Sequence, residues 1–392
     1  MKLVFPDYAK YCIEKLESNR FEAWFVGGCV RDAILERKCV DIDITTNATP
    51  EQIMSIFEHT IPTGIKHGTV TVMSGGKPVE ITTYRTESKY IDFRHPENIS
   101  FVGDIKEDLA RRDFTINALA YNDNHGLKDL FGGLDDLKKK VIKSVGNPLK
   151  RFSEDALRIL RAYRFASVLG FSISDDVKDA SVRLIPLLEN ISGERVLSEL
   201  TKLSKGQNLS TVFEFINCGG LSNFGIKGFT INIEVVEKLA QSEIESSFKL
   251  PLFISLNYHN TTTIKDKLKP NNKLYAQINL LDRLCNEKPS LNDKISLKKF
   301  LSLYGTDNTR LYLYYLWLEG LDKADMLLTY YNQVMSDGEP YSISHLAIGG
   351  DDLISGGISG RDIGKALEEA LDFVIKYPEK NTKNELLNLL KK

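Results

Sequence analysis

Two aspartates separated by one residue are the first side chains of this sequence that could carry chemistry. Asp41 and Asp43 lie in a segment, 41–46, in which polar and apolar residues alternate as in a half-buried strand. Side chains of a strand alternate between its faces, so both carboxylates are expected to point the same way. Adjacent carboxylates repel each other unless a cation lies between them, and Mg²⁺ prefers oxygen ligands and keeps substrate phosphates in its shell. The pair is a candidate Mg²⁺ site for phosphoryl transfer, although solvent-facing aspartate pairs are also common.

A third carboxylate, Glu80, lies on a second predicted strand. The β-rich segments 69–73 and 79–84 flank the sequence SGGKP at 74–78, which is typical of a hairpin. Glu80 could complete a metal shell or act as a base. The alternative is an edge-strand glutamate that is simply solvated.

Two glycines upstream of the aspartates are candidates for phosphate binding. Gly27 and Gly28 follow a buried strand predicted at 23–26, and a helix carrying Arg31 and Asp32 is expected from Val30. Glycines at such a turn let backbone N–H groups approach phosphate oxygens, and the start of a helix favours anions. No P-loop motif occurs in the sequence, so this turn is the candidate phosphate-binding element. The alternative is a plain strand-to-helix turn.

A run of basic residues follows the expected α/β segment. It contains two acidic residues, Glu154 and Asp155, against nine lysines and arginines at 138, 139, 140, 143, 150, 151, 158, 161 and 164. A nucleic-acid-binding protein needs such a stripe on one face, whatever its net charge, which here is −2. Charge alone favours the alternative, a solvated helix.

The remaining pattern predicts a small α/β head followed by a long helical part. The sequence TPEQ at 49–52 is typical of a capped helix start. Ser153 is a candidate N-cap and Gly170 a candidate stop for a helix that carries Asp155, Arg158 and Arg161. Beyond it the chain is leucine-rich, with helical periodicity. The fold class expected is therefore α+β.

Composition excludes several other classes of protein. The chain has 392 residues, 42% of them hydrophobic and 27% charged, which suggests a globular protein of two to four structural units. No apolar stretch is long enough for a transmembrane helix, and the first residues lack the apolar core of a signal peptide. Five scattered cysteines and the absence of an HExxH motif argue against a zinc site or a disulfide framework. We therefore expect no membrane association and a reducing, cytoplasmic setting.

Several motifs, taken together, resemble one known family. The runs GGCVRD at 27–32 and DID at 41–43 resemble the head of the polymerase-β-like superfamily, in its branch of tRNA nucleotidyltransferases and bacterial poly(A) polymerases. RRDFTINA at 111–118, EDALRILRAYRF at 154–165 and GERV at 193–196, leading to Glu199, look like its later signatures. LAIGGDDL at 346–353 and IGKAL at 363–367 resemble the tail of the bacterial enzymes, although the loop 356–361 departs from it.

The resemblance implies a fold and a reaction. A nucleotidyltransferase head (1–140), a helical neck (141–205), a helical body (206–285) and a helical, tRNA-binding tail (286–392) are expected. The class II CCA-adding enzymes of this branch transfer CMP and AMP from CTP and ATP to the 3′ end of tRNA, with release of pyrophosphate. Magnesium on Asp41 and Asp43 would promote attack by the tRNA 3′-hydroxyl. The expected partners are ATP, CTP and the acceptor arm and elbow of tRNA, with no protein partner implied.

The same match assigns residues to the nucleotide site. Gly28 and Arg31 would contact the triphosphate, and Asp113 would hold the ribose 2′-hydroxyl. Three arginines are also assigned to the nucleotide site by this match: Arg112, Arg161 and Arg164. The alternative for Arg112 is surface charge on a helix.

Base choice can be argued from hydrogen-bonding chemistry. Asp155 and Arg158 are three residues apart, so on a helix they would share a face. A carboxylate accepts and a guanidinium donates, which matches the amino group and ring nitrogen of both adenine and cytosine but not guanine or uracil. Such a pair would accept ATP and CTP and reject GTP and UTP. Without the family match, an intrahelical salt bridge between the two residues would be favoured.

The sequence also distinguishes members of the branch. Residues 85–96 resemble the flexible loop of full CCA-adding enzymes, and 65–70 resemble the tRNA enzymes more than the arginine-rich run of poly(A) polymerases. The full CCA reaction is therefore favoured. An A-adding or CC-adding tRNA nucleotidyltransferase, then a poly(A) polymerase, then a non-catalytic RNA-binding relative remain the alternatives.

Overall fold

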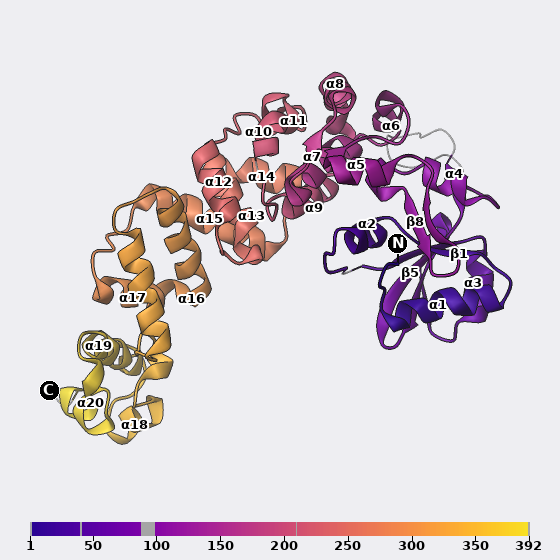
Figure 1. The fold of residues 1–392 in the computed structure, drawn as a ribbon. Helices are drawn as coiled ribbons and strands as arrows, with labels where there is room; N and C mark the ends of the chain where they lie inside the picture. The colour runs from indigo at the N-terminus through magenta and orange to yellow at the C-terminus, as the bar shows by residue number, and fades with distance from the viewer. Residues whose placement is uncertain (1, 40, 88–98, 209, 391–392) are drawn as a thin grey trace. The chain divides into compact units, whose positions relative to one another are not determined.

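The chain folds as two compact units in the computed structural model, which describes residues 2–39, 41–87, 99–208 and 210–390 (Figure 1). The first unit comprises residues 1–231 together with 266–269, and the second comprises 232–265 together with 270–392. The predicted loop at 85–96 lies outside the described residues from position 88 onward.

A seven-stranded mixed sheet forms the head of the first unit, which confirms the α+β class. Its strand order is β3-β4-β5-β2-β1-β8-β9. Strand β2 pairs in parallel with β5, so that Asp43 lies opposite Glu80, and it pairs antiparallel with β1. The strands are β1 (Ala23–Val26), β2 (Asp43–Thr46), β3 (Thr60–Gly64), β4 (Thr69–Ser74), β5 (Lys77–Thr83), β8 (Leu119–Asn122) and β9 (Gly126–Asp129).

Local sequence explains the centre of this sheet. All four residues of β1 are buried, as the apolar run predicts. Strands β4 and β5 form the predicted hairpin, and its two turn glycines, Gly75 and Gly76, have φ of 55° and 73°. Positive φ at both central residues is what a tight two-residue hairpin requires. Two smaller ladders join β6 (Arg85–Glu87) to β7 (Ile99–Phe101) and β10 (Val141–Ile142) to β11 (Ser172–Ile173).

Short helices accompany the sheet. The predicted helix start at Thr49 is confirmed: its side chain accepts from the Gln52 N–H, and the Gln52 side chain accepts from the Thr49 N–H. This reciprocal pairing satisfies two N–H groups that a helix start would leave open. The head helices are α1 (Asp7–Ser18), α2 (Gly28–Ile34), α3 (Pro50–Ile56), α4 (Ile105–Ala110) and α5 (Gly133–Lys139).

The helix expected between Ser153 and Gly170 is two helices. Asn147 caps an earlier start, Pro148 occupies the first turn, and this helix continues through Ser153 to Glu154. Asp155 is extended, with φ −140° and ψ 104°, and the next helix ends as predicted at the left-handed Gly170. The helices in this part of the chain are α6 (Pro148–Glu154), α7 (Leu157–Leu169), α8 (Asp175–Leu184), α9 (Gly193–Leu203), α10 (Ser210–Asn217) and α11 (Gly220–Asn223).

The described residues beyond 231 are helical, as the periodicity predicted. Short 3₁₀ helices occur at Ile65–His67, Thr115–Asn117, Ile185–Asn190, Ile343–His345 and Pro378–Lys380. The remaining helices are α12 (Ile233–Gln241), α13 (Ser246–Asn257), α14 (Thr261–Leu268), α15 (Asn272–Glu287), α16 (Lys294–Leu318), α17 (Ala324–Ser336), α18 (Gly350–Ser355), α19 (Asp362–Lys376) and α20 (Lys383–Leu390).

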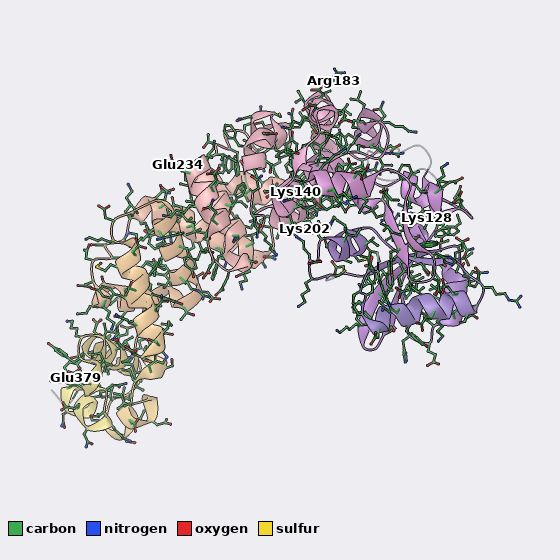
Figure 2. The ribbon with its side chains drawn as sticks, in the orientation of Figure 1. Lys128, Lys140, Arg183, Lys202, Glu234 and Glu379 are labelled. Atoms are coloured by element: carbon green, nitrogen blue, oxygen red, sulfur yellow. The ribbon has the colours of Figure 1, made fainter. Side chains whose placement is uncertain are left out.

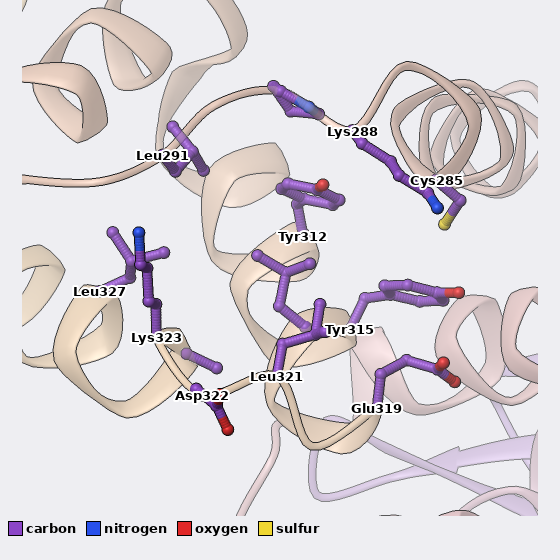
Figure 3. Close-up of a pocket in the computed structure, with 13 residues that line it drawn as sticks. Cys285, Lys288, Leu291, Tyr312, Tyr315, Glu319, Leu321, Asp322, Lys323 and Leu327 are labelled. Atoms are coloured by element: carbon purple, nitrogen blue, oxygen red, sulfur yellow. The ribbon is translucent and has the colours of Figure 1, made fainter.

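The second unit contains a mainly apolar cavity of about 440 Å³ between α15, α16 and α17 (Figure 3). Tyr312 and Tyr315 from α16 and Leu327 from α17 line it, and Lys288 and Lys323 add charge. Among the described residues, no helix is both long enough and apolar enough to cross a membrane.

Candidate active site

Three carboxylates lie in the region where β2 and β5 run side by side, near enough for their charges to interact. Strand β2 begins at Asp43, so Asp41 precedes it instead of lying on it, although a hydrogen bond from Glu80 N to Ile42 O (3.1 Å) extends the pairing toward Asp41. Strand β5 lies between β4 and β2, so Glu80 is not on an edge strand. Asp43 is half-buried, whereas Asp41 and Glu80 are exposed. The strand pairing therefore brings Glu80 to the aspartates.

The charges of these groups act on one another. Burial raises the pKa of the Asp43 carboxyl to about 6; Arg112 opposes the rise, and the charges of Glu80 and Asp41 add to it. When the charges of neighbouring carboxylates raise the pKa of a carboxyl group, a cation bound among the carboxylates stabilises its charged form. Among the described His, Cys, Asp and Glu side chains, no three converge as a ready-made metal site. Two carboxylates still fit Mg²⁺, which commonly takes one or two protein ligands together with water and substrate phosphates.

The glycine turn lies beside these carboxylates. Gly27 has φ 73° and ψ −131°, a conformation that other residues rarely adopt. A Cβ atom on Gly27 would lie 2.8 Å from Nη1 of Arg112 and 3.9 Å from Oδ2 of Asp43. Only glycine therefore lets the Arg112 guanidinium cross this turn. Gly28 follows as the first residue of α2.

Arg112 joins the carboxylates to the rest of the site. It follows α4 and is half-buried, so the alternative of surface charge on a helix is wrong. Its Nη2 lies 3.3 Å from Oδ2 of the buried Asp108, and its Nη1 donates to the Asn117 carbonyl at 3.5 Å. Its Nε is buried and has no hydrogen-bond partner. A buried donor without a partner is costly, which is a reason to expect that a ligand satisfies it.

Arg31 is buried and contacts the Asn117 side chain. Its Nη1 donates to Oδ1 of Asn117 at 2.6 Å, and its Nε donates to Oδ1 of Asp32 at 2.9 Å. Asn117 in turn donates through Nδ2 to Oδ1 of Asp113 at 3.0 Å. Asn117 therefore links Arg31 and Asp113 through its side-chain amide and Arg112 through its backbone carbonyl.

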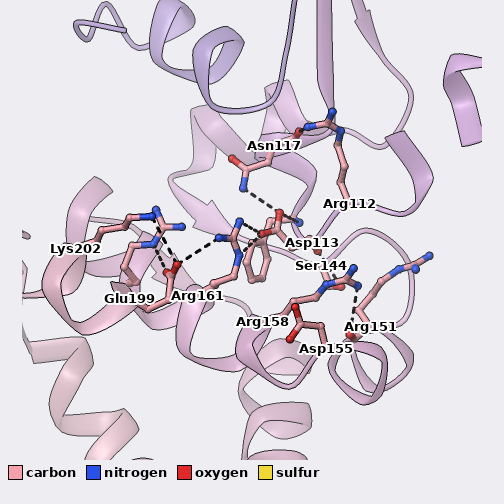
Figure 4. Close-up of polar contacts among 12 residues, drawn as sticks. Arg112, Asp113, Asn117, Ser144, Arg151, Asp155, Arg158, Arg161, Glu199 and Lys202 are labelled. Carbon is pink, nitrogen blue, oxygen red and sulfur yellow. Dashed lines mark hydrogen bonds and ion pairs between the residues drawn. The ribbon is translucent and has the colours of Figure 1, made fainter. Parts of the chain in front are cut away.

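Asp113 holds the head to helix α7. Nε and Nη2 of Arg161 both donate to Oδ2 of Asp113, at 2.8 and 2.6 Å (Figure 4). Burial alone would raise the pKa of Asp113, but Arg161, the Asn117 amide and Arg158 outweigh it and hold that pKa well below the usual range. Asp113 is therefore charged in the folded protein.

Glu199 on α9 continues the network. Its carboxylate lies 3.6 Å from Nη1 of Arg161 and accepts from Nε of Arg164 at 2.9 Å. The Arg164 guanidinium lies 3.5 Å from the centre of the Phe165 ring, which the guanidinium carbons of Arg31 and Arg161 approach to 5.1 and 5.4 Å. Burial lowers the pKa of Arg164 to about 10, against the opposing charge of Glu199. Carboxylates and an aromatic face thus hold several arginines together.

Asp155 and Arg158 do not have the geometry expected of them. Because the helix breaks at Asp155, the two residues do not share a helix face, and each pairs elsewhere. Oδ2 of Asp155 accepts from Nη2 of Arg195 at 2.7 Å, and its Oδ1 accepts from the Leu157 N–H at 3.0 Å. Arg158 pairs with Glu154 at 3.0 Å. The alternative of a salt bridge between Asp155 and Arg158 is therefore wrong.

The structure thus collects the predicted residues into two linked groups. Asp41, Asp43 and Glu80 form the carboxylate cluster. The arginine network comprises Arg31, Arg112, Asp113, Asn117, Arg161, Arg164 and Glu199, with Asp155 and Arg158 close enough to affect its charges. Sequence reasoning assigned no role to Asn117, Phe165, Arg195 or Glu199, although each falls within or beside a quoted signature.

Comparison with known proteins agrees with these motifs. Residues 23–143 match the family model described as the poly A polymerase head domain, and residues 170–215 match one described as a probable RNA and SrmB-binding site of polymerase A. A CCA-adding enzyme of Lactobacillus delbrueckii subsp. bulgaricus is 39% identical over 389 residues, which cover 96% of each chain. One from Staphylococcus haemolyticus is 44% identical over 300 residues, covering 76% of this chain and 74% of the relative.

A solved structure agrees over nearly the whole length. The Bacillus stearothermophilus CCA-adding enzyme in complex with CTP superimposes with a TM-score of 0.80 at 28% identity, covering 98% of this chain and 97% of that one. Fold, motifs and full-length similarity coincide, and the chain therefore belongs to the CCA-adding enzymes, the tRNA nucleotidyltransferases that its signatures resemble.

Proposed function

We propose that this chain adds C, C and A to the tRNA 3′ end with the carboxylate cluster as its metal-binding site and the arginine network as its nucleotide site. Arg112 is the observation that carries this assignment. Its guanidinium crosses the Gly27 turn near Asp43 and reaches Asn117, while its Nε is buried and unpaired. Arg112 therefore belongs to the arginine network, acts on the charge of Asp43, and keeps one hydrogen-bond donor without a partner.

Divalent-metal dependence belongs to nucleotidyltransferases in general, and Mg²⁺ is the ion we propose here. Asp41 and Asp43 would hold it, with Glu80 as a third carboxylate opposite Asp43. When bound, the ion supplies charge stabilisation for the triphosphate and for the leaving pyrophosphate. Glu80 is exposed and can serve either as a further ligand or as a proton acceptor.

The triphosphate is the natural ligand for the open donors beside this cluster. Gly28, Arg31 and Arg112 would bind it, since backbone N–H groups and guanidinium groups both suit phosphate oxygens. Asp113 would hold the ribose 2′-hydroxyl through a carboxylate that Arg161 and Asn117 keep charged and oriented. Arg161 and Arg164 complete the site beside Phe165.

We still propose that Asp155 and Arg158 recognise the base, although they do not share a helix face. Each uses only part of its bonding capacity: a carboxylate offers about four acceptor sites and a guanidinium five donors. Asp155 accepts from Arg195 and from the Leu157 N–H, while Arg158 donates to Glu154 and two backbone carbonyls. Arg195 also keeps one buried nitrogen without a partner. These fixed contacts orient both groups and leave capacity for a base.

The tRNA would be held mainly through its phosphates. The lysines of the basic run are exposed, as are Arg183 and Lys202 (Figure 2), whereas its arginines are at least partly buried. A tRNA acceptor arm is an A-form helix whose deep, narrow major groove side chains cannot read, so shape and phosphate contacts carry binding. Further candidate contacts are Lys265, Lys267, Lys269, Lys273, Lys294, Lys298 and Lys299.

Lys298 is a weak member of that set, because it is buried and paired with Glu339. We retain the division into head (1–140), neck (141–205), body (206–285) and tail (286–392) as part of the proposal. The cytoplasm remains the proposed setting, where tRNA substrates are available.

The test uses tRNA transcripts that end before, within and after the CC sequence, incubated with Mg²⁺ and CTP, ATP or both. Two C additions followed by one A are expected. Asp41→Ala should lose at least a thousandfold in rate, while the matched control Asp135→Ala, whose side chain is 72% exposed, should keep the wild-type rate. Activity should disappear with EDTA and return with Mg²⁺.

Each contrary result has a definite meaning. Addition of only CC, of only the terminal A, or of a long A run would replace the proposal with the corresponding relative. A wild-type rate in Asp41→Ala would contradict the metal assignment. Absence of incorporation by the wild-type chain on every transcript would contradict catalysis altogether.

A further inference from the structure

The cavity between α15, α16 and α17 (Figure 3) has the size and lining of a site for a small organic molecule. Its volume of about 440 Å³ lies within the range of about 300–1,000 Å³ that is usual for such sites. Leu291 and Leu327 are buried in its wall, whereas Leu321, another lining residue, is 53% exposed. All lining residues belong to the second unit. The cavity is therefore separate from the carboxylate cluster and the arginine network, which lie in the first.

Tyr312 supplies a buried hydroxyl group to the cavity lining. It is 3% exposed, and its ring packs against the rings of Phe300 and Tyr315, with centroids 5.5 and 6.4 Å away. The hydroxyl makes no hydrogen bond to another residue in the described part of the chain. Burial raises the pKa of Tyr312 to about 12, so the group stays protonated at neutral pH and is able to donate. A buried donor of this kind favours a ligand that accepts from it.

Lys288 supplies a positive charge to the same lining. It follows the last residue of α15 with φ 48° and ψ 62°, and its backbone N–H donates to the Leu284 carbonyl at 2.9 Å. No carboxylate of the described residues forms an ion pair with its ammonium group. The second lining lysine, Lys323, already donates to Oδ1 of Asn292 at 2.7 Å. Lys288 is therefore the cation that is open to an anionic group.

Two carboxylates also line the cavity and oppose an anion. Glu319 and Asp322 are both exposed. In Figure 3 both acidic groups lie on the side of Leu321 that is away from the Tyr312 ring. Charges exposed to water and salt act only weakly on their neighbours. The hydroxyl of Tyr312 and the charge of Lys288 therefore decide which ligands suit the site.

We propose that this cavity binds a small aromatic carboxylate. Its ring lies against Tyr312 and the leucines, an acceptor atom in the ring takes the hydrogen bond of the Tyr312 hydroxyl, and its carboxylate pairs with Lys288. Flat rings suit an apolar wall that also presents tyrosine rings. The proposal does not rest on the proposed function, because no residue of the carboxylate cluster or the arginine network lines the cavity.

Three probes of similar shape test the ligand class. Quinoline-4-carboxylate has a ring nitrogen and a charge, naphthalene-1-carboxylate lacks the nitrogen, and quinoline-4-methanol lacks the charge. Ligand-observed NMR measures the Kd of each for the full-length protein. We expect quinoline-4-carboxylate to bind with a Kd of about 1 mM or tighter, as its size allows. The other two should bind about two- to tenfold more weakly, which is the loss expected for one hydrogen bond or one exposed ion pair.

Two substitutions assign these contacts to residues. Tyr312→Phe should bind quinoline-4-carboxylate and naphthalene-1-carboxylate equally, because it removes the donor that distinguishes them. Lys288→Met should bind quinoline-4-carboxylate and quinoline-4-methanol equally, because it removes the charge that distinguishes them. Both variants should fold, since the Tyr312 hydroxyl has no hydrogen bond to lose and Lys288 is exposed.

Two further variants and a competitor test the location. Leu321→Trp enlarges an exposed lining residue and should weaken all three probes by about fivefold or more. Leu303→Trp is the matched control, because Leu303 lies on α16 outside the cavity and is 73% exposed, and it should leave binding unchanged. Saturating CTP should not displace quinoline-4-carboxylate, which separates this site from the arginine network.

The contrary outcomes are equally definite. Absence of saturable binding, binding that CTP abolishes, or equal binding by Leu321→Trp and the wild type would overturn the cavity as the site. Equal affinity of the wild type for quinoline-4-carboxylate and quinoline-4-methanol would overturn the anionic class of ligand. Equal affinity of the wild type for the two carboxylates would overturn the hydrogen bond from Tyr312.

Discussion

Two clusters of buried charge, one in each unit, use similar groups in different ways. In the first unit, Asp113 pairs with Arg161, which also approaches Glu199. In the second, Lys298 is 1% exposed, lies 3.2 Å from Oε2 of Glu339 and donates to the Ile375 carbonyl at 3.1 Å. Both clusters tie together segments that are far apart in the sequence. Burial of charge alone therefore does not distinguish an active site from a structural bridge.

The difference lies in what each cluster leaves unsatisfied. Lys298 and Glu339 have partners within the cluster, and Lys294 adds a second positive charge to Glu339. In the arginine network, Arg112 Nε is a buried donor with no partner, and so is Nη1 of the neighbouring Arg195. Positive groups with open donors are prepared for an anionic ligand, whereas the Lys298 cluster is complete without one. This contrast predicts which substitutions affect reaction rate and which affect stability alone.

The largest effect is expected from removing Arg161. Arg161→Gln leaves Asp113 and Glu199 buried with reduced compensation, a type of change that costs about 3–5 kcal/mol, and it also removes a nucleotide contact. The thermal midpoint of the first unit should fall by several degrees, and the rate at a temperature where the variant is folded should fall at least a hundredfold. Circular dichroism and initial rates with CTP measure the two effects.

Lys298→Met is the matched control for that variant. It removes a buried charge from the second unit, so stability should fall while the rate of the folded protein stays within about twofold. A large loss of rate in folded Lys298→Met would erase the distinction between the clusters. So would a normal rate in Arg161→Gln.

A change in base selectivity is the next largest effect. Arg158→Ala should lower the preference for ATP over GTP and for CTP over UTP by about 1–3 kcal/mol, or roughly 5- to 150-fold, which is the cost of losing one bidentate base contact. Ratios of kcat/KM for the four nucleotides measure it. Arg151→Ala is the control, because Arg151 shares the Glu154 carboxylate with Arg158 but has no proposed contact with the base. Equal loss of selectivity in both variants would mean that Glu154 positioning, not base reading, is responsible.

Local signals in the sequence were sufficient for much of the head. The Thr49 cap, the Gly75-Gly76 hairpin, strand β1 and the stop at Gly170 all depend on residues within a few positions of one another. The break at Asp155 was missed because Asn147 and Pro148 start an earlier helix, which runs through the predicted cap Ser153 and ends at Glu154. The single predicted helix placed Asp155 and Arg158 on one face. In the structure, the two residues do not share a helix face.

Long-range pairing could not be read from the same signals. The basic run looked uniform, yet its lysines are exposed while Arg158, Arg161 and Arg164 are buried or half-buried beside acids from other segments. Glu199 lies 35 positions from Arg164, and no periodicity reveals that contact. The family signatures contained both residues without indicating that they meet. Metal binding and base reading stay predictions until they are measured.

The smallest effect expected is on stability at acid pH, and it again compares the Asp113 cluster with the Lys298 cluster. Because the folded pKa of Asp113 lies well below its ordinary value, its contribution is fully present above an unfolded pKa of about 3.9 and is lost as pH falls below it. Linkage then predicts that the stability difference between wild type and Asp113→Asn shrinks by on the order of 1 kcal/mol between pH 7 and pH 3. Glu339→Gln should show a loss of the same sign, since the pKa of Glu339 is also lowered. Only Asp113→Asn should in addition weaken nucleotide binding at pH 7, because the ion pair between Glu339 and Lys298 has no proposed contact with the nucleotide. Weakened nucleotide binding in Glu339→Gln would contradict this difference between the two clusters.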